Sequence, residues 1–365
     1  MSTTTTTTTT TLPPKSTLPT SKLPGANRMP FDGLPTNYND FRDALSRDGY
    51  AVIKGAIPRE RADKYADAFL SYLEGFGLGY SRHDPSTVRR AKLPVLNEKG
   101  MIQAYGVTHE QWVWDIRGEA GVIDAFAKVY DDEELIVSFD VVNVGFVNRE
   151  DLPEKMGIGI GLLTKRNSKP WPHQDQDPAK PGFRCLQGLI NLHPSGPNDG
   201  GLIVCKGGHN VSAEFHAAMA ARDEPRIPAW TPEWFGFTEG GMAWLAERGL
   251  QWEKVCCEPG DLIVWDSRTP HYNVPPTGAV DRLAVYTCYT PVCEASREDL
   301  VRKKGAFEQR LGTTHWPNAV HVAPTNVAMR DGERCPVARE RPVQEPVLSE
   351  RTYKLTGIPY LEAMG

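Results

Sequence analysis

The chain has 365 residues, of which 40 % are hydrophobic, 24 % charged and 9 % aromatic, and this is enough apolar material for a large core. The composition argues against a disordered or collagenous protein, and a formal net charge of −5 without a long basic run argues against a nucleic-acid partner. No stretch approaches the roughly 18 apolar residues of a membrane helix, and no signal-peptide pattern opens the chain, so we expect a cytoplasmic protein without a membrane partner.

The first part of the chain is predicted to contain a tail, two helices and a strand. Residues 1–27 include nine consecutive threonines and almost no large apolar side chain, so we expect a disordered tail. A short helix follows near Phe41, and Gly49 turns the chain into a strand over 50–53. Apolar residues at helical spacing predict a second helix over 58–75.

From about residue 110 onward, the pattern changes to short apolar runs broken by Gly, Pro, Asn and Asp. These runs lie at 135–139, 158–163, 185–192, 202–205, 262–265 and 282–287. Many short strands favour a mainly β sandwich or barrel with flanking helices. The β pattern resumes after a mostly helical insertion at about 211–252, so we predict one domain over 28–300. Residues 301–365 would form a C-terminal extension that either covers the active-site mouth or makes a subunit contact.

The pair His173-x-Asp175 is the first candidate for metal binding. On an extended chain the two side chains share a face, roughly 7 Å apart, although this pair also occurs often by chance. His271 follows a turn and an apolar strand, and it would complete a 2-His-1-carboxylate triad, which leaves open positions on Fe(II). Asp177 is the rival carboxylate, but Pro178 indicates that the strand ends there.

Arg282 opens an otherwise apolar strand eleven residues after His271. A guanidinium cannot be buried alone, so it must either reach solvent or pair with an anion. Its planar fork suits a carboxylate, such as one end of a dicarboxylate co-substrate.

In combination, these motifs resemble the phytanoyl-CoA dioxygenase (PhyH) family of Fe(II)/2-oxoglutarate oxygenases, over roughly residues 36–292. The matching features are the segment 48–53, the His173-x-Asp175 pair, the strand and turn over 198–209, the turn Pro259-Gly260-Asp261, His271 and Arg282. The resemblance implies a double-stranded β-helix (jelly roll, cupin-like) in which His173, Asp175 and His271 bind iron. It also implies 2-oxoglutarate and O2 as co-substrates, with Arg282 on the far carboxylate of 2-oxoglutarate.

Two further polar residues are candidates for co-substrate binding. Asn273 stands where the family often has a hydroxyl residue that contacts the same carboxylate, and an amide can donate that hydrogen bond. Gln187 lies on a strand suited to burial and therefore needs a partner, for which 2-oxoglutarate and a structural network are both open.

Other residues near the motifs are weaker candidates for substrate contact. Trp171 is either a wall of the pocket or an ordinary core aromatic. Arg268 and Tyr272 flank His271, although a solvated loop position is the commoner role for such an arginine. We expect a structural role for His209, and no motif assigns a role to His315.

The resemblance favours oxidation of a small molecule, by hydroxylation, desaturation or ring formation, with release of succinate and CO2. Halogenating relatives lack the carboxylate present here as Asp175. We expect a secondary metabolite or an amino-acid-like substrate, because no basic patch suits the phosphates of a CoA thioester. The alternative is a cupin-like hydrolase or isomerase that uses the triad without 2-oxoglutarate, and a non-enzymatic binding module is less favoured. The oligomeric state is open, and a homodimer is compatible with the sequence.

Overall fold

The computed structural model describes residues 27–32, 34, 37–147, 170–222, 226–318 and 321–364. Nearly all of the predicted tail and the predicted strand over 158–163 lie outside these residues. The helices are α1 (Phe41–Asp48), α2 (Arg59–Glu74), α3 (Gln111–Arg117), α4 (Ala120–Tyr130), α5 (Ser212–Ala221), α6 (Glu239–Glu247), α7 (Arg297–Glu308), α8 (Glu350–Lys354) and α9 (Ile358–Ala363). None of the helices in the described ranges combines the length and apolar character needed to cross a membrane.

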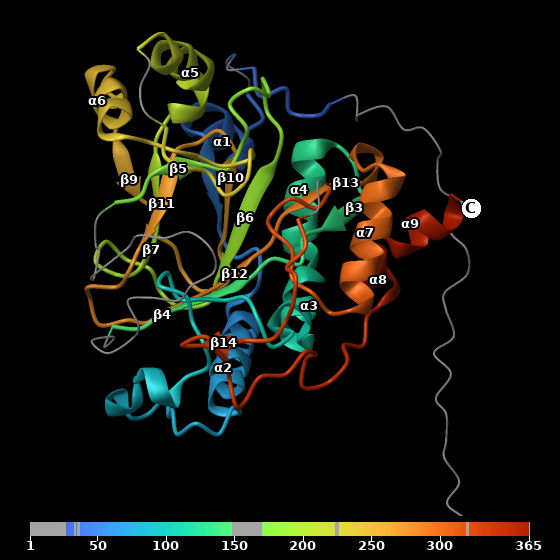
Figure 1. Ribbon diagram of the computed structural model, residues 1–365. Helices are drawn as coiled ribbons and strands as arrows, with labels where there is room; N and C mark the ends of the chain where they lie inside the picture. The colour runs from blue at the N-terminus through green and yellow to red at the C-terminus, as the bar shows by residue number, and fades with distance from the viewer. Residues whose placement is uncertain are drawn as a thin grey trace, which may run out of the picture.

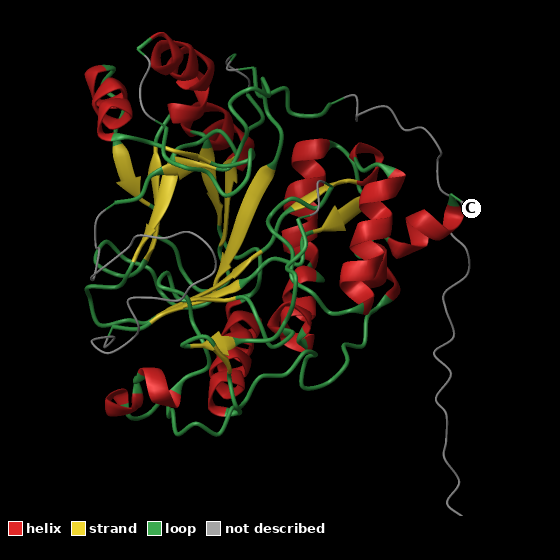
Figure 2. Ribbon diagram, viewed as in Figure 1, coloured by secondary structure: helices red, strands yellow, loops and turns green. Residues whose placement is uncertain are grey.

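Two antiparallel sheets form the centre of the molecule (Figures 1 and 2). The larger sheet has the order β1 (Tyr50–Ile53), β10 (Leu262–Asp266), β6 (Leu186–Asn191), β12 (Arg282–Tyr286), β4 (Val142–Gly145) and β2 (Met101–Ile102). The smaller sheet has the order β8 (Phe235–Gly236), β5 (His173–Gln174), β11 (His271–Val274), β7 (Gly201–Cys205) and β9 (Trp252–Lys254). Two further antiparallel pairs are β13 (Tyr289–Pro291) with β3 (Leu135–Val137), and β14 (Met329–Arg330) with β15 (Glu333–Arg334).

An apolar cluster fills the space between the two sheets. Leu189, Ile263 and Ala284 come from the larger sheet, and Leu202 and Val204 come from the smaller one. Because these side chains pack in one cluster, the sheets face each other as in a sandwich. The prediction of a jelly roll is confirmed, and this interior is the space into which the site residues must point.

Helices cover the opposite face of the larger sheet (Figure 2). Along β12, Leu283 and Val285 pack in the main core with α4 residues such as Phe126, while Ala284 and Tyr286 face the interior. The predicted helices and strand near the N-terminus are confirmed as α1, β1 and α2.

The expectation of short β runs from about residue 110 is wrong for residues 111–130, which form α3 and α4. Both helices are covered by other elements, and α3 alone buries Trp112, Val113, Trp114 and Ile116. Three of these apolar residues are consecutive and α3 has only seven residues, so its helical period is hard to recognise in the sequence.

The insertion predicted at 211–252 contains α5, β8 and α6 and lies beside β9 (Figure 1). It has an apolar cluster of its own, which includes Phe215, Met219, Phe237 and Trp244. After β13, α7 and α8 pack near α3 and α4, and α9 packs against α7 (Figure 1). Leu355 and Ile358 are part of the main core.

Candidate functional site

Three buried side chains meet in the smaller sheet. His173 begins β5, Asp175 follows its last residue, and His271 begins β11 directly opposite His173 in the antiparallel register. The candidate ligand atoms of the three all lie within 4.8 Å of one another. Asp175 Oδ2 is 3.7 Å from His173 Nε2 and 3.3 Å from His271 Nε2. The fold therefore brings together the three residues that the sequence singled out.

Backbone carbonyls orient both imidazoles. His173 Nδ1 lies 3.2 Å from the carbonyl oxygen of Trp171, and His271 Nδ1 lies 2.9 Å from that of Thr269. A carbonyl oxygen can only accept, so each Nδ1 carries the proton and each Nε2 presents its lone pair toward Asp175. This is the usual arrangement of metal-binding histidines.

Burial also favours the protonation states that bind metals. It lowers the pKa of His173 to about 3, and the neighbouring His271 acts in the same direction. Burial alone raises the pKa of Asp175, but the surrounding histidines outweigh it and hold this pKa below its ordinary value. Near neutral pH the cluster therefore offers a neutral imidazole at His173 and an anionic carboxylate at Asp175.

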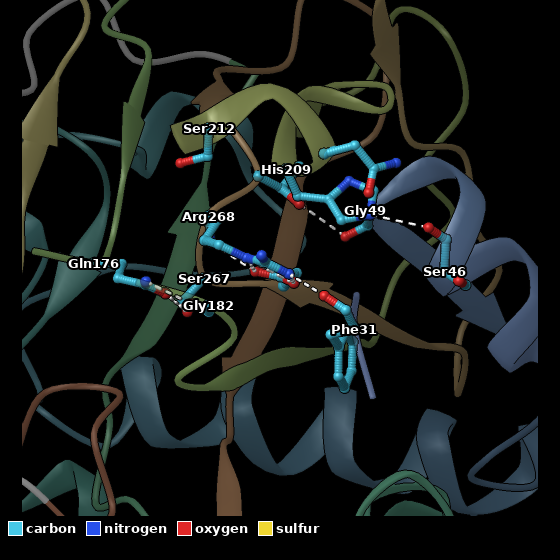
Figure 3. Close-up of polar contacts among 12 residues, drawn as sticks. Phe31, Ser46, Gly49, Gln176, Gly182, His209, Ser212, Ser267 and Arg268 are labelled. Atoms are coloured by element: carbon cyan, nitrogen blue, oxygen red, sulfur yellow. Dashed lines mark hydrogen bonds and ion pairs between the residues drawn. The ribbon is translucent and has the colours of Figure 1, made fainter. Parts of the chain in front are cut away.

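A hydrogen-bond network holds the Asp175 carboxylate and the loop behind it. Gln187 Nε2 donates to Asp175 Oδ2 at 2.8 Å, and the Asp175 backbone N–H donates to the carbonyl of Ser267 at 3.2 Å. Ser267 Oγ donates to Gln176 Oε1 at 2.8 Å, and Gln176 Nε2 donates to the carbonyl of Gly182, also at 2.8 Å (Figure 3). Gln187, which we predicted to contact co-substrate, therefore hydrogen-bonds to Asp175, a candidate metal ligand.

Trp171 stacks on His173, with ring centroids 4.3 Å apart and an angle of 8° between the planes. Its indole N–H donates to the carbonyl of Asn273 at 3.3 Å. The ammonium of Lys99, a residue without any sequence signal, lies 3.2 Å from the centroid of the same indole. Burial lowers the pKa of Lys99 to about 8. Trp171 is therefore a wall between His173 and a partly buried cation.

Arg282 faces the interior from the larger sheet, because it alternates with Ala284 and Tyr286 along β12. The side chain is buried, and Nη1 donates to Asn143 Oδ1 at 2.8 Å while Nη2 donates to the Tyr286 hydroxyl at 3.4 Å. In the part of the chain that the structure describes, no carboxylate pairs with this guanidinium. A buried cation with only neutral partners is suited to bind an anion.

The remaining candidates fall on both sides of β11. Asn273 shares the interior face with His271, since the two pair with the interior residues Leu202 and Val204 of β7. Its Oδ1 is buried and has no hydrogen-bond partner among the described residues. Tyr272 points to the other face and packs against Trp252, with ring centroids 5.4 Å apart.

Arg268 is engaged in the scaffold. Its Nη2 lies 2.6 Å from Asp266 Oδ2 and also donates to the carbonyl of Phe31 at 3.2 Å (Figure 3). His209 has the same kind of role, because its Nε2 lies 3.0 Å from the carbonyl of Ser46. Arg268 and Tyr272, both expected to meet substrate, are therefore not brought to the triad.

His315 reaches the triad from the C-terminal part of the chain. Burial lowers the pKa of His315, the charge of Asp175 raises it, and His271 lowers it further. The next residue, Trp316, packs against Cys185, whose carbonyl accepts a hydrogen bond from the N–H of Ser267, the residue that pairs with Asp175. No sequence signal points to His315, because its relation to the triad exists only after the extension has packed on the sheets.

Comparison with known proteins places this site in a family. A profile of the family described as phytanoyl-CoA dioxygenase (PhyH) matches residues 45–284. The chain belongs to this family. The phytanoyl-CoA dioxygenase resemblance is thereby confirmed, and the protein is a non-haem Fe(II)/2-oxoglutarate-dependent oxygenase. The Ava biosynthesis cluster protein O of Aspergillus versicolor is similar, with 38 % identity over 298 residues that cover 81 % of this chain and 92 % of that protein.

Solved structures are similar to this chain at low sequence identity. The crystal structure of the hypothetical protein JW0805 from Escherichia coli has 16 % identity and a TM-score of 0.54, covering 86 % of this chain and 80 % of that chain. That of the epimerase SnoN in complex with Fe3+, alpha ketoglutarate and nogalamycin RO has 16 % identity and a TM-score of 0.44, covering 85 % of this chain and 95 % of that chain.

Proposed function

We propose that this oxygenase oxidises a small molecule of secondary metabolism, with His173, Asp175 and His271 as the iron ligands and Arg282 as the anchor of 2-oxoglutarate. The observation that carries the proposal is the buried triad, whose ligand atoms lie within 4.8 Å of one another, in an interior that also holds a guanidinium without a carboxylate partner. Two imidazole nitrogens and one carboxylate form the donor set that non-haem Fe(II) oxygenases use.

The three ligands fit iron in their chemistry and in their support. The carbonyls of Trp171 and Thr269 fix the two rings, and Gln187 fixes the carboxylate of Asp175. With 2-oxoglutarate and O2, bound iron supplies the oxidising power, and succinate and CO2 are released. The protein residues position the ligands and keep the site dry, as the burial of all three shows.

Arg282 would bind the carboxylate of 2-oxoglutarate that lies farther from iron. Its Nη1 donates to Asn143 and its Nη2 to the Tyr286 hydroxyl, which leaves the Nε–H and one N–H on each Nη for a carboxylate. Asn273 lies on the same interior face as His271, and its side chain is placed to contact the same co-substrate. A hydrolase or isomerase with this triad would have no use for a buried guanidinium at this position.

The name of the Aspergillus versicolor relative, a biosynthesis cluster protein, supports a secondary metabolite as substrate. An amino-acid-like compound, the other expected substrate class, is also a small molecule. The presence of Asp175 favours hydroxylation, desaturation or ring formation as the reaction, since the carboxylate takes the position that a halide would need.

Succinate formation tests this function. We expect the protein with Fe(II) to convert 2-oxoglutarate to succinate in an oxygen-dependent reaction, and Arg282→Ala to lose at least ten-fold in kcat/KM for 2-oxoglutarate. Arg184→Ala is the matched control, because Arg184 is exposed just before β6, the strand that pairs with β12. No succinate from the wild-type protein, or equal values for Arg282→Ala and wild type, would refute the proposal.

A further inference from the structure

Residues 313–318 form a segment, here called the strap, that lies beyond the region matched by the family profile. Thr313 fixes the strap to Phe139, which lies shortly before β4. The backbone N–H of Thr313 donates to the carbonyl of Phe139 at 2.8 Å, and Thr313 Oγ1 accepts from the Phe139 N–H at 2.9 Å. Thr313 also forms an isolated antiparallel bridge with Val322. The first residue of the strap is therefore held between Phe139 and Val322.

Trp316 anchors the strap to the larger sheet. Its side chain is 3 % exposed and packs with Cys185 and Cys288, which lie just before β6 and just after β12. These two strands carry Gln187 and Arg282, respectively. The anchor thus lies at the ends of the strands that hold the candidate site.

Three consecutive residues of the strap carry buried polar atoms without a partner. Thr314 Oγ1, His315 Nε2 and Trp316 Nε1 are each buried, and none has a hydrogen-bond partner within the described ranges. His315 directly precedes Trp316, which packs on Cys185. The Cys185 carbonyl accepts from the Ser267 N–H, and the Ser267 carbonyl accepts from the Asp175 N–H, so the strap lies beside the candidate metal ligand Asp175. Buried polar atoms are paired in most native structures, so three neighbouring exceptions beside a metal-binding triad indicate that a ligand completes them.

We propose that the strap is one wall of the substrate pocket and that His315 Nε2 forms a hydrogen bond with a hydroxyl or amide group of the substrate. This inference rests on the proposed function and names the chemistry of its substrate. A site built to hydrogen-bond a polar group rejects an analogue without that group, because its own buried atom then stays unpaired. His315 is therefore a specificity-determining residue, supplied by a segment outside the region that the family profile covers.

The experiment uses matched pairs of probes: small alcohols with their methyl ethers, and secondary amides with their N-methyl derivatives. Binding is measured by calorimetry on the full chain loaded with 2-oxoglutarate and Zn(II), which takes similar ligands but does not react with oxygen. The variants are His315→Leu, which removes the polar atom, His315→Gln, which keeps a polar group, and His321→Leu. His321 is the control because its side chain is exposed in the neighbouring segment.

We expect at least one pair in which the alcohol or secondary amide binds wild type about ten-fold more tightly than its methylated partner. His315→Leu abolishes this preference, His315→Gln keeps part of it, and His321→Leu keeps all of it. The proposal is overturned if His315→Leu keeps the preference, or if no pair shows one in the wild-type protein.

The charge-transfer band of the Fe(II) and 2-oxoglutarate complex separates the two levels of inference. We expect His315→Leu to show the same band as wild type. A variant that is folded but lacks the band would show that His315 positions Asp175 and does not select substrate. Absence of the band in the wild-type protein would refute the proposed function itself, whatever the probes show.

Discussion

Gly49 connects α1 to the turn that precedes β11 and His271, and its replacement by alanine gives a sharp test of the geometry. Gly49 ends α1 with φ +82°, and its carbonyl accepts from the N–H of Asp266 at 3.0 Å and from Thr269 Oγ1 at 2.9 Å. The carbonyl of Thr269 in turn orients His271. A Cβ at position 49 would lie 2.5 Å from His209 Nδ1 and 2.6 Å from Thr269 Oγ1. Gly49 and His209 are both labelled in Figure 3.

The net cost of Gly49→Ala follows from three effects. The left-handed backbone costs an alanine roughly 1–2 kcal/mol, and the two close contacts add about 1–3 kcal/mol of overpacking. The smaller entropy of the unfolded variant returns about 0.4–1 kcal/mol. Gly55 has φ +61° and no atom within 4 Å of its Cβ position, so Gly55→Ala carries the backbone strain without the contacts.

Urea unfolding of wild type and the two variants measures the free energies of unfolding. We expect Gly49→Ala to be less stable than Gly55→Ala by about 1–3 kcal/mol, the overpacking contribution. We also expect weaker Fe(II) binding in Gly49→Ala alone, since the displaced Thr269 carries the carbonyl that orients His271. Equal stability losses in the two variants would refute the reasoning.

Two further variants test the support of the site and a buried carboxyl group near it. Gln187→Leu removes the hydrogen bond to Asp175, so we expect the affinity for Fe(II) to fall by about 10–100-fold in equilibrium dialysis. An unchanged affinity would contradict the role assigned to Gln187. Burial raises the pKa of Asp140 to about 7, so the folded state favours the protonated form of this side chain. Asp140 therefore lowers the free energy of unfolding as pH rises from about 4 through 7. Asp140→Asn keeps an acceptor for the Val141 N–H. In urea unfolding, we expect its free energy of unfolding relative to wild type to increase by on the order of 2–4 kcal/mol between pH 5 and 8. A pH-independent difference would refute this account.

The triad could be predicted because its signals are local. His173 and Asp175 are two positions apart, and His271 follows a turn and strand that are recognisable in the sequence. Arg282 could be recognised as a charge at the start of an apolar strand. Each of these arguments uses the alternation of a strand or the cost of a buried charge.

The partners of these residues could not be predicted, because they depend on which strands pair. Asn143 meets Arg282 only through the antiparallel register of β4 with β12, across 139 residues of sequence. Gln187 could be recognised as a buried polar residue in need of a partner, but only the fold places it on Asp175. His315 arrives from an extension whose position is set by packing and not by a motif.

Anaerobic titration of the metal-free protein with Fe(II) and then 2-oxoglutarate tests the central claim most directly. We predict a visible charge-transfer band that requires both additions, is weakened in Arg282→Ala because the co-substrate loses its anchor, and is lost in Asp175→Ala because iron loses a ligand. Tight Fe(II) binding without a band on addition of 2-oxoglutarate would contradict the assignment of this site.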